Sequence, residues 1–396
     1  MDRYLVISSD GHAGLPPERY RDYLDPQYRA KFDEELAKEI AARAEAESAF
    51  LISDFNTRWR AENADGLSGA WDTAARNRVL DADGVAAEVL FTDGITENNS
   101  PPFQADLGMR PFDADPELQW AGARSFNRWL SEFCREEPVR RIGMGLCPAL
   151  WDVETSVKEI YWAKEHGLKG LQLSHIVEGY DNYNHPKYYP MWAALEETGM
   201  VANFHSGASQ PYDQTSPGWV GIYCCEYPFW LTRPLIAMIF GGVFDLFPKL
   251  KVAFTEVGGD FWWPAMIQLM DFRAKVKKGS AKMGDHSAKL QLKPSEYMRR
   301  NVWIGSSAQM DDQNYEDYYK IGMDRVMWGT DYPHPEGTWP NTDEQMHGAL
   351  DGLAETELEK VLGLNAVECF DLDIEPLNKI ASRIGPPKSR FVKQAA

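Results

Sequence analysis

Short apolar runs alternate with helical stretches along the whole chain, and eight of these runs are predicted to be β-strands. The predicted strands are Tyr4–Ser9, Val85–Phe91, Ile142–Pro148, Gly170–Leu173, Val201–His205, Lys251–Glu256, Val302–Gly305 and Val326–Thr330. This alternation favours a (β/α)8 barrel, or TIM barrel, over a doubly wound sheet. A doubly wound sheet would be expected to carry a glycine-rich turn after its first strand, and the chain has no G-x-G-x-x-G motif.

The predicted helices lie between these strands. Pro116–Glu137 is the clearest of them, because its aromatic side chains recur at helical spacing. The others are Arg76–Asp83, Val153–Glu165, Tyr189–Thr198, Tyr227–Phe247, a helix ending at Lys277, Asp312–Lys320 and Thr342–Leu362.

A long polar segment, residues 15–75, follows the first strand and is predicted to be a helical insertion into the barrel. Its centre, Lys31–Ser48, is rich in Ala, Glu, Lys and Arg and is predicted to be a surface helix. Its tip, Asn63–Ser68, is predicted to be a loop over the site. Because neither end of the insertion has linker composition, we expect a single domain over residues 1–396, ending in a polar tail over residues 371–396.

The composition, 44% apolar and 12% aromatic, is that of a globular protein with a large core. The formal net charge of −19, from 60 acidic and 41 basic residues, argues against nucleic acid or a membrane surface as a partner.

The five cysteines follow neither a disulfide framework nor C-x-x-C spacing, so reduced thiols are expected. The sequence has no signal-peptide pattern and no membrane-length apolar stretch, which predicts a cytoplasmic protein.

Four side chains that can bind metal stand where predicted strands end. Asp10 and His12 follow the first strand, His205 closes the fifth, and Asp331 follows the eighth. The carboxyl ends of parallel barrel strands meet at one rim, so these donors are expected to converge. We therefore predict one divalent metal ion bound by these four side chains. Asp331 is also predicted to accept a proton from metal-bound water.

Three further side chains are candidates at the same rim. Glu256 ends the sixth strand, and it could be a further ligand, a general acid or base, or a member of a structural ion pair. His334 lies between two prolines, and His175 ends the fourth strand. Either imidazole could hydrogen-bond metal-bound water or a substrate oxygen, and His334 is the preferred catalytic candidate.

Aromatic residues are concentrated in the loops that follow the predicted strands. They are Tyr180, Tyr183, Trp219, Tyr223, Phe261, Trp262, Trp263 and Trp339. Helix packing explains some of them, and Tyr180, Trp219 and Trp339 are candidates for an apolar wall around a ring or conjugated substrate. Three arginines could pair with a substrate carboxylate or form ordinary salt bridges: Arg76, Arg233 and Arg273. Of these, Arg233 is the candidate substrate ligand.

Several motifs together point to a known family. They are S-D-G-H at the first strand, L-D-A-D-G-V-A-A-E-V-L-F through the second, N-F-H-S-G at the fifth, F-P-K-L-K-V-A-F-T-E-V-G-G at the sixth, W-G-T-D-Y-P-H at the eighth, and L-G-L-N-A near the end of the last helix. In this combination the chain resembles the amidohydrolase superfamily. Within it, the likeness is to the amidohydrolase 2 group, which includes aminocarboxymuconate-semialdehyde decarboxylase and γ-resorcylate decarboxylase.

The resemblance implies a single divalent metal ion at the barrel mouth, with zinc expected first and manganese or iron as alternatives. By motif, the family's ligands fall on Asp10, His12, His205 and Asp331. The sequence departs from the family pattern twice. The first strand carries D-x-H where better-known members carry H-x-H or E-x-H, which favours a harder metal. The sixth strand offers Glu256 where the decarboxylases have a catalytic histidine.

Three functions are open. The main prediction is hydrolysis of a small aromatic or unsaturated carbonyl or carboxylate substrate by metal-activated water, because Glu256 replaces the histidine that moves protons in the decarboxylases. The alternative is non-oxidative decarboxylation or hydration of an aromatic or unsaturated acid, in which Glu256 or His334 moves the proton. The third is a metal-free binding scaffold. In each case the partner is a small molecule, and family habit implies a homodimer.

Overall fold

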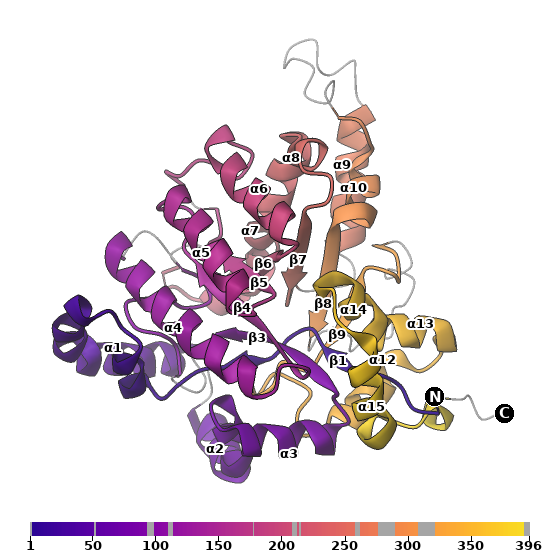
Figure 1. Ribbon diagram of the computed structural model, residues 1–396, viewed down its shortest axis with the longest axis horizontal. Coiled ribbons are helices and arrows are strands. Elements are labelled where there is room, and N and C mark those ends of the chain that lie inside the picture. Colours follow the sequence, from indigo (N-terminus) through magenta and orange to yellow (C-terminus); the bar gives the residue numbers. More distant parts are fainter. Residues whose placement is uncertain are drawn as a thin grey trace.

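The structure is a computed structural model, and it describes residues 2–50, 53–92, 99–109, 114–176, 178–207, 212–213, 215–257, 262–275, 290–307 and 321–391. Its parallel strands form one sheet that curls around a central axis, and helices cover the outer face of the sheet (Figure 1). Apolar side chains of the strands and of the covering helices fill the space between these two layers. This arrangement confirms the (β/α)8 barrel that the sequence predicts.

The strands are β1 (Ile7–Ser8), β2 (His12–Ala13), β3 (Ala87–Thr92), β4 (Arg141–Cys147), β5 (Gly170–Leu173), β6 (Val201–His205), β7 (Lys251–Thr255), β8 (Val302–Ser307) and β9 (Val326–Gly329). Spatial neighbours follow the sequence in the order β1-β3-β4-β5-β6-β7-β8-β9, and β2 also pairs with β3. β1 and β2 together make the first barrel strand, which is interrupted over residues 9–11.

Backbone hydrogen bonds close the barrel between its first and last strands. The backbone N–H of Ser9 donates to the oxygen of Trp328 at 2.7 Å, and that of Asp331 donates to the oxygen of Asp10 at 3.0 Å. A third bond, 2.7 Å long, runs from the N–H of His12 to the oxygen of Tyr332. We call these three bonds the seam. They hold the strand ends that carry three of the predicted metal ligands side by side.

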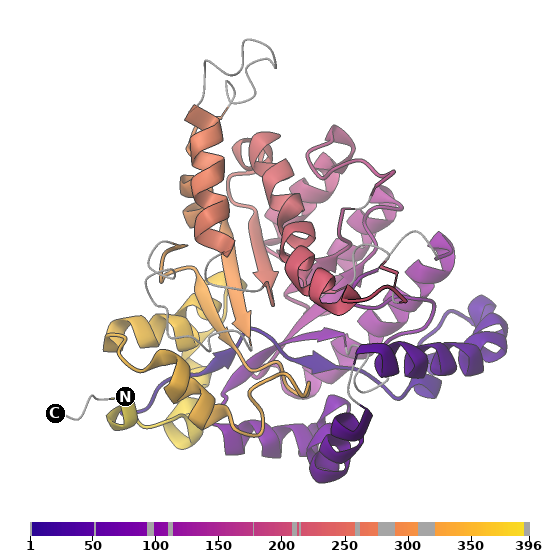
Figure 2. The same cartoon turned by 180° about the vertical axis from the view of Figure 1, so that it is seen from behind.

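The helices form the outer layer, and α1 and α2 of the insertion project at the side away from the chain termini (Figures 1 and 2). The helices are α1 (Arg29–Phe50), α2 (Ser53–Leu67), α3 (Thr73–Asp83), α4 (Pro116–Glu136), α5 (Val153–Glu165), α6 (Tyr189–Thr198), α7 (Trp219–Phe240), α8 (Val243–Leu246), α9 (Trp262–Lys275), α10 (Pro294–Asn301), α12 (Thr342–Leu350), α13 (Glu355–Glu359), α14 (Asn365–Phe370) and α15 (Ile374–Ile384). Within the described residues, no helix is both long enough and apolar enough to cross a bilayer.

Local sequence explains where several helices begin and end. The side chains of Asp72, Asp115 and Asp152 accept hydrogen bonds from backbone N–H groups in the first turns of α3, α4 and α5, which satisfies donors that the helix itself leaves unpaired. Gly84 and Gly199 end α3 and α6 in the left-handed conformation that glycine adopts without a steric cost.

Several predicted element boundaries were wrong. The tip of the insertion, Asn63–Ser68, is no loop, because α2 continues through Leu67 and a 3-10 turn begins at Ser68. The last predicted helix, Thr342–Leu362, is broken after Leu350, close to Gly352 with its φ of 108°. The predicted helix Asp312–Lys320 lies outside the described residues.

The carboxyl-terminal segment packs against the start of the barrel. Leu377 and Ala381 of α15 are buried, and the backbone N–H of Tyr4 donates to the oxygen of Pro386 at 3.0 Å. The described part of the predicted polar tail is therefore largely a helix with one apolar face against the barrel.

A buried ion pair joins α3 to the barrel. Nη2 of Arg76, in α3, donates to Oε2 of Glu88 on β3 at 2.8 Å, and Nε of the same guanidinium donates to Oε1. Nη1 donates to the backbone oxygens of His12 and Gly69, each at 2.9 Å. Both charged side chains are fully buried, which costs free energy unless geometry and hydrogen bonding are nearly complete. Arg76 thus forms a structural salt bridge and fixes the backbone of a predicted metal ligand.

Replacing Arg76 by Met is expected to lower the free energy of unfolding by about 3–5 kcal/mol, because Glu88 would keep its buried charge without a partner. Urea denaturation followed by circular dichroism measures the loss. The control is Arg78→Met on the exposed face of the same helix, which should change stability by less than about 0.5 kcal/mol. Equal effects of the two substitutions would contradict the structural role of Arg76.

Candidate metal centre

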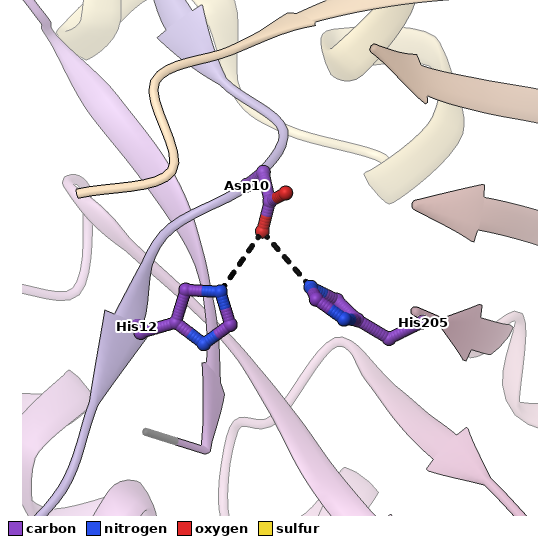
Figure 3. Close-up of side chains that lie close together, drawn as sticks. All are labelled: Asp10, His12 and His205. Carbon is purple, nitrogen blue, oxygen red and sulfur yellow. Dashed lines mark hydrogen bonds and ion pairs between the residues drawn. The ribbon is translucent and has the colours of Figure 1, made fainter. Parts of the chain in front are cut away.

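Three of the predicted ligands meet at the carboxyl ends of the strands (Figure 3). Asp10 follows β1 and lies between two imidazoles. Its Oδ1 is 3.1 Å from Nε2 of His205, at the end of β6, and 3.5 Å from Nε2 of His12, in β2. All three side chains are fully buried. The interrupted first strand and the strand across the barrel from it thus bring two nitrogen donors to one carboxylate.

Asp331, two residues after β9, adds a second carboxylate. Its Oδ1 lies 3.0 Å from Nε2 of His12 and 3.2 Å from Nδ1 of His334. The ring of His334 stacks on that of His12, with centroids 3.9 Å apart. The backbone at Asp331 has a φ of 55°, a left-handed conformation that is uncommon for residues other than glycine. We call Asp10, His12, His205 and Asp331 the donor group.

Hydrogen bonds to the backbone orient both histidines of the donor group. Nδ1 of His12 lies 2.7 Å from the oxygen of Thr92, and Nδ1 of His205 lies 3.1 Å from the oxygen of Ser206. A carbonyl oxygen only accepts, so each Nδ1 carries the hydrogen that it donates. When either ring is neutral, its Nε2 offers a lone pair to the group, which is the arrangement that metal-binding histidines use.

The donor group fits a cation. Burial and the charge of His334 lower the pKa of His12, but its contacts with Asp10 and Asp331 outweigh them and raise that pKa to about 10. Burial would raise the pKa of both carboxyl groups, yet the neighbouring imidazoles hold both below the usual range. Among the described residues, Oδ2 of Asp331 makes no hydrogen bond and no ion pair. A buried group of two carboxylates and two imidazoles, with one carboxylate oxygen left without a donor, is suited to a divalent ion.

Glu256 lies beside the donor group, directly after β7. Its Oε2 is 3.7 Å from Nδ1 of His205 and accepts a hydrogen bond from the hydroxyl of Ser206. Burial, and then the charges of Asp331 and Asp10, raise the pKa of Glu256 well above its usual value. The carboxyl group is therefore placed to hold a proton next to the donor group, which suits a general acid.

His175 stands behind the donor group. Its Nε2 donates to the backbone oxygen of His205 at 2.7 Å, and burial lowers its pKa to about 4. The ring is therefore neutral at physiological pH, and it supports the end of the strand that carries His205. Its role in binding substrate stays a prediction.

The other predicted substrate ligands lie on outer elements and loops. Tyr180 packs edge-on against Trp151 with centroids 5.5 Å apart. The guanidinium of Arg233, in α7, lies 5.7 Å from the ring centroid of Trp230, and Trp219 opens the same helix. Their roles at the substrate stay predictions.

Trp339 joins the insertion to the loop after β9. It belongs to a buried cluster with Trp59 and Leu67 of the insertion and with Tyr332. A Cβ at Gly66 would lie 2.2 Å from its ring, so α2 approaches the indole closely. The contacts of Trp339 hold the insertion near the rim, and its role in binding substrate also stays a prediction.

Two residues of the site were not singled out for chemistry by the sequence. Glu336 follows His334 by two positions, and one of its carboxylate oxygens lies within 4.8 Å of those of Glu256 and Asp331. Tyr223, in α7, was noted only among the aromatic residues. Burial and then the charge of Glu256 raise the pKa of Tyr223. The run P-H-P-E could have drawn attention to Glu336, whereas nothing in the sequence ties Tyr223 to Glu256.

The fold and the donor group define a (β/α)8 protein with a candidate metal centre at the carboxyl rim of its barrel. The family model described as amidohydrolase matches residues 71–372. The protein belongs to this amidohydrolase family, as its motifs predict.

Known relatives are similar over most of their length. A 2-amino-3-carboxymuconate-6-semialdehyde decarboxylase of Dictyostelium discoideum is 28% identical over 308 residues, which are 77% of this chain and 78% of the relative. The 5-carboxyvanillate decarboxylase of Sphingomonas paucimobilis has the same fold, with a TM-score of 0.63 at 22% identity, over 94% of this chain and 100% of that chain. The 5-carboxyvanillate decarboxylase of Novosphingobium aromaticivorans, complexed with manganese and 4-hydroxy-3-methoxy-5-nitrobenzoic acid, has a TM-score of 0.66 at 22% identity, over 93% and 96%.

Metal binding is expected to release a proton from His12. The pKa of His12 is about 10 in the metal-free site, so its ring is protonated at every pH below that value, and a ligand must be neutral. Between about pH 7 and 8.5 the first Mn²⁺ bound per chain should therefore displace at least one proton, and the apparent affinity should rise at least about tenfold per pH unit. Calorimetry in buffers of different ionisation enthalpy measures this release. A release that falls toward zero over this range would contradict the raised pKa.

Proposed function

We propose that the protein is a metal-dependent decarboxylase of a small aromatic or unsaturated acid. The observation that carries this proposal is the buried donor group with the carboxyl group of Glu256 beside it, in a chain whose relatives include a decarboxylase similar over about three quarters of both lengths. The relatives favour the alternative that the sequence left open, and they outweigh the preference for hydrolysis, which rested on Glu256 alone.

We propose that Asp10, His12, His205 and Asp331 hold one divalent metal ion. When bound, such an ion supplies a Lewis acid that polarises oxygen atoms of the substrate. Two nitrogen and two oxygen donors suit zinc, which the sequence put first, and equally suit manganese. Manganese becomes the first candidate because the solved relative from Novosphingobium aromaticivorans holds it.

In the proposed reaction, Glu256 is the general acid. Its carboxyl group transfers a proton to the substrate carbon that bears the carboxylate. The bond from that carbon to the carboxylate then breaks, carbon dioxide leaves, and the electron pair of the broken bond restores the unsaturated system. The Glu256 carboxylate regains its proton from water. Ser206 donates to Oε2 of Glu256, which fixes the direction in which the other oxygen presents the proton.

The test of this activity is release of carbon dioxide from carboxylated phenols and from unsaturated carboxylic acids. The Mn²⁺-loaded protein should release it, whereas chelation should abolish release and added Mn²⁺ should restore it. Hydrolysis of an ester, lactone or amide by the loaded protein, with no carbon dioxide from any of these acids, would return the hydrolase as the better assignment.

Glu256→Gln is expected to lower kcat about 10²–10⁴-fold, because the amide fills the same space but cannot transfer the proton. Bound Mn²⁺, counted by mass spectrometry of the metal, and the thermal midpoint identify a variant that stays folded and loaded. The matched control is Glu344→Gln in the exposed first turn of α12, which should keep full activity. A Glu256→Gln variant with unchanged kcat would exclude Glu256 as the general acid.

We also propose that the protein acts as a homodimer through the amino-terminal half of α7. Val220, Ile222 and Phe229 of this helix are exposed, although outer helices of a barrel normally present polar residues to water. Glu226 and Arg233 are the only charged residues of α7. Two chains that each carry a net charge of −19 repel one another least where they meet through a weakly charged face, so the charge of this helix favours a second copy of the chain as the partner.

Ile222→Glu is expected to convert a dimer into a monomer, because two-fold symmetry would bury the new charge on both copies. Light scattering after size-exclusion chromatography measures the mass. The control is Ile40→Glu on α1, where the side chain has a similar exposure of 38%. A monomeric wild-type protein at tens of micromolar, or a dimer that tolerates Ile222→Glu, would refute this interface.

The five cysteines are free thiols, as the sequence predicts. They support the cytoplasmic location, which stays a proposal together with the single-domain organisation.

A further inference from the structure

A second group of possible metal ligands lies next to the donor group. Glu256, Asp331 and Glu336 each place a carboxylate oxygen within 4.8 Å of the others. They come from two strand ends and from the loop after β9. Asp331 belongs to this group and also to the group that contains His12 and His334. We call Glu256, Asp331 and Glu336 the carboxylate group.

Within the described part of the chain, no lysine or arginine forms an ion pair with any of these three carboxylates. The ion pairs there join Glu256 to His205, and Asp331 to His12 and His334. Carboxylates at this separation repel one another, and the repulsion is stronger where protein replaces water around them. Such a group is stable when it holds a proton or a cation.

An independent observation at Asp331 points to a cation. Asp331 is fully buried, and both of its ion pairs use Oδ1. Among the described residues, Oδ2 has neither a hydrogen-bond partner nor an ion-pair partner. Leaving a buried carboxylate oxygen without a donor costs free energy, and one cation in the donor group does not require both oxygens. A second cation would bind Oδ2, because both imidazoles contact Oδ1.

The chemistry of the carboxylate group differs from that of the donor group. All three of its ligands are carboxylate oxygens, whereas the donor group mixes imidazole nitrogen with oxygen. Oxygen-only sites suit hard cations such as Mg²⁺, Ca²⁺ or Mn²⁺. The side chain of Glu256 is 17% exposed and Glu336 is exposed, so water can complete the coordination. Few protein ligands and open access imply weaker binding than in the donor group.

We propose that Glu256, Asp331 and Glu336 form a second, weaker site for a hard divalent cation, with Asp331 shared between the two sites. The chain would then bind two divalent ions, one in the donor group and one in the carboxylate group. This inference concerns cation binding and does not rest on decarboxylation.

The experiment titrates metal-free full-length protein with Mn²⁺ and follows free Mn²⁺ by its electron paramagnetic resonance signal. The wild-type protein should bind two ions per chain, one tightly and one at least tenfold more weakly. Glu336→Gln should remove the weaker ion and keep the tight one, because Glu336 belongs only to the carboxylate group. Ca²⁺ should displace the weaker ion first.

Control variants make each outcome decisive. Glu344→Gln, an exposed change on α12, should keep both ions, and His205→Ala should weaken the tight site. Circular dichroism and the thermal midpoint identify variants that stay folded. One ion per chain in the wild-type protein up to millimolar Mn²⁺ would overturn the proposal. Two ions retained by Glu336→Gln, or both lost while the variant stays folded, would overturn it as well. None of these readouts depends on whether carbon dioxide is formed.

Discussion

The seam between the first and last strands is the constraint on which the site depends. Its bonds join Ser9, Asp10 and His12 to the chain around Asp331 through backbone atoms alone. The N–H of Asp331 donates to the oxygen of Asp10, so two buried carboxylates are held close by their own main chains in spite of their charges. A parallel barrel closes only where its first and last strands meet, and in this protein that meeting point carries three of the four predicted metal ligands.

The molecule balances its buried charges in two different ways. At Arg76 and Glu88 both charges come from the chain, and the guanidinium uses its remaining donors on the backbone oxygens of His12 and Gly69. At the rim the chain supplies an excess of carboxylates: Asp10 and Asp331 raise the pKa of His12, and burial followed by the charges of Asp331 and Asp10 raises the pKa of Glu256. The first arrangement is complete without a ligand and stabilises the fold. The second is complete only with protons or cations, which makes the rim a candidate binding site.

The sequence was sufficient to predict the barrel and to predict that Asp10, His12, His205 and Asp331 lie close together, because an apolar run that ends in a polar side chain marks both a strand and the place where the strand ends. Their role as metal ligands stays a prediction. It could not predict the interruption of the first strand over residues 9–11, which follows from pairing with β3 and from the seam. It also could not assign Arg76, since its partner Glu88 lies within a buried strand and only the fold brings them together. Glu336 was missed for a related reason: its position follows from the path of the loop after β9, which has no periodic pattern.

Glu256 shows how one residue type changes the chemistry of a site with a given geometry. A histidine at this position would offer a nitrogen and could carry a positive charge, which would oppose a cation nearby. A glutamate offers oxygen atoms. It is neutral at physiological pH only when its surroundings raise its pKa, and when it is deprotonated its negative charge attracts a cation. Burial and the charges of Asp331 and Asp10 raise that pKa, whereas a cation bound in the donor group would offset those charges and lower it. If the donor group holds a metal ion as proposed, the protonation of Glu256 would therefore be coupled to its occupancy. The same side chain would then supply a proton in the proposed reaction or an oxygen ligand in the proposed second site, as the metal content of the rim changes.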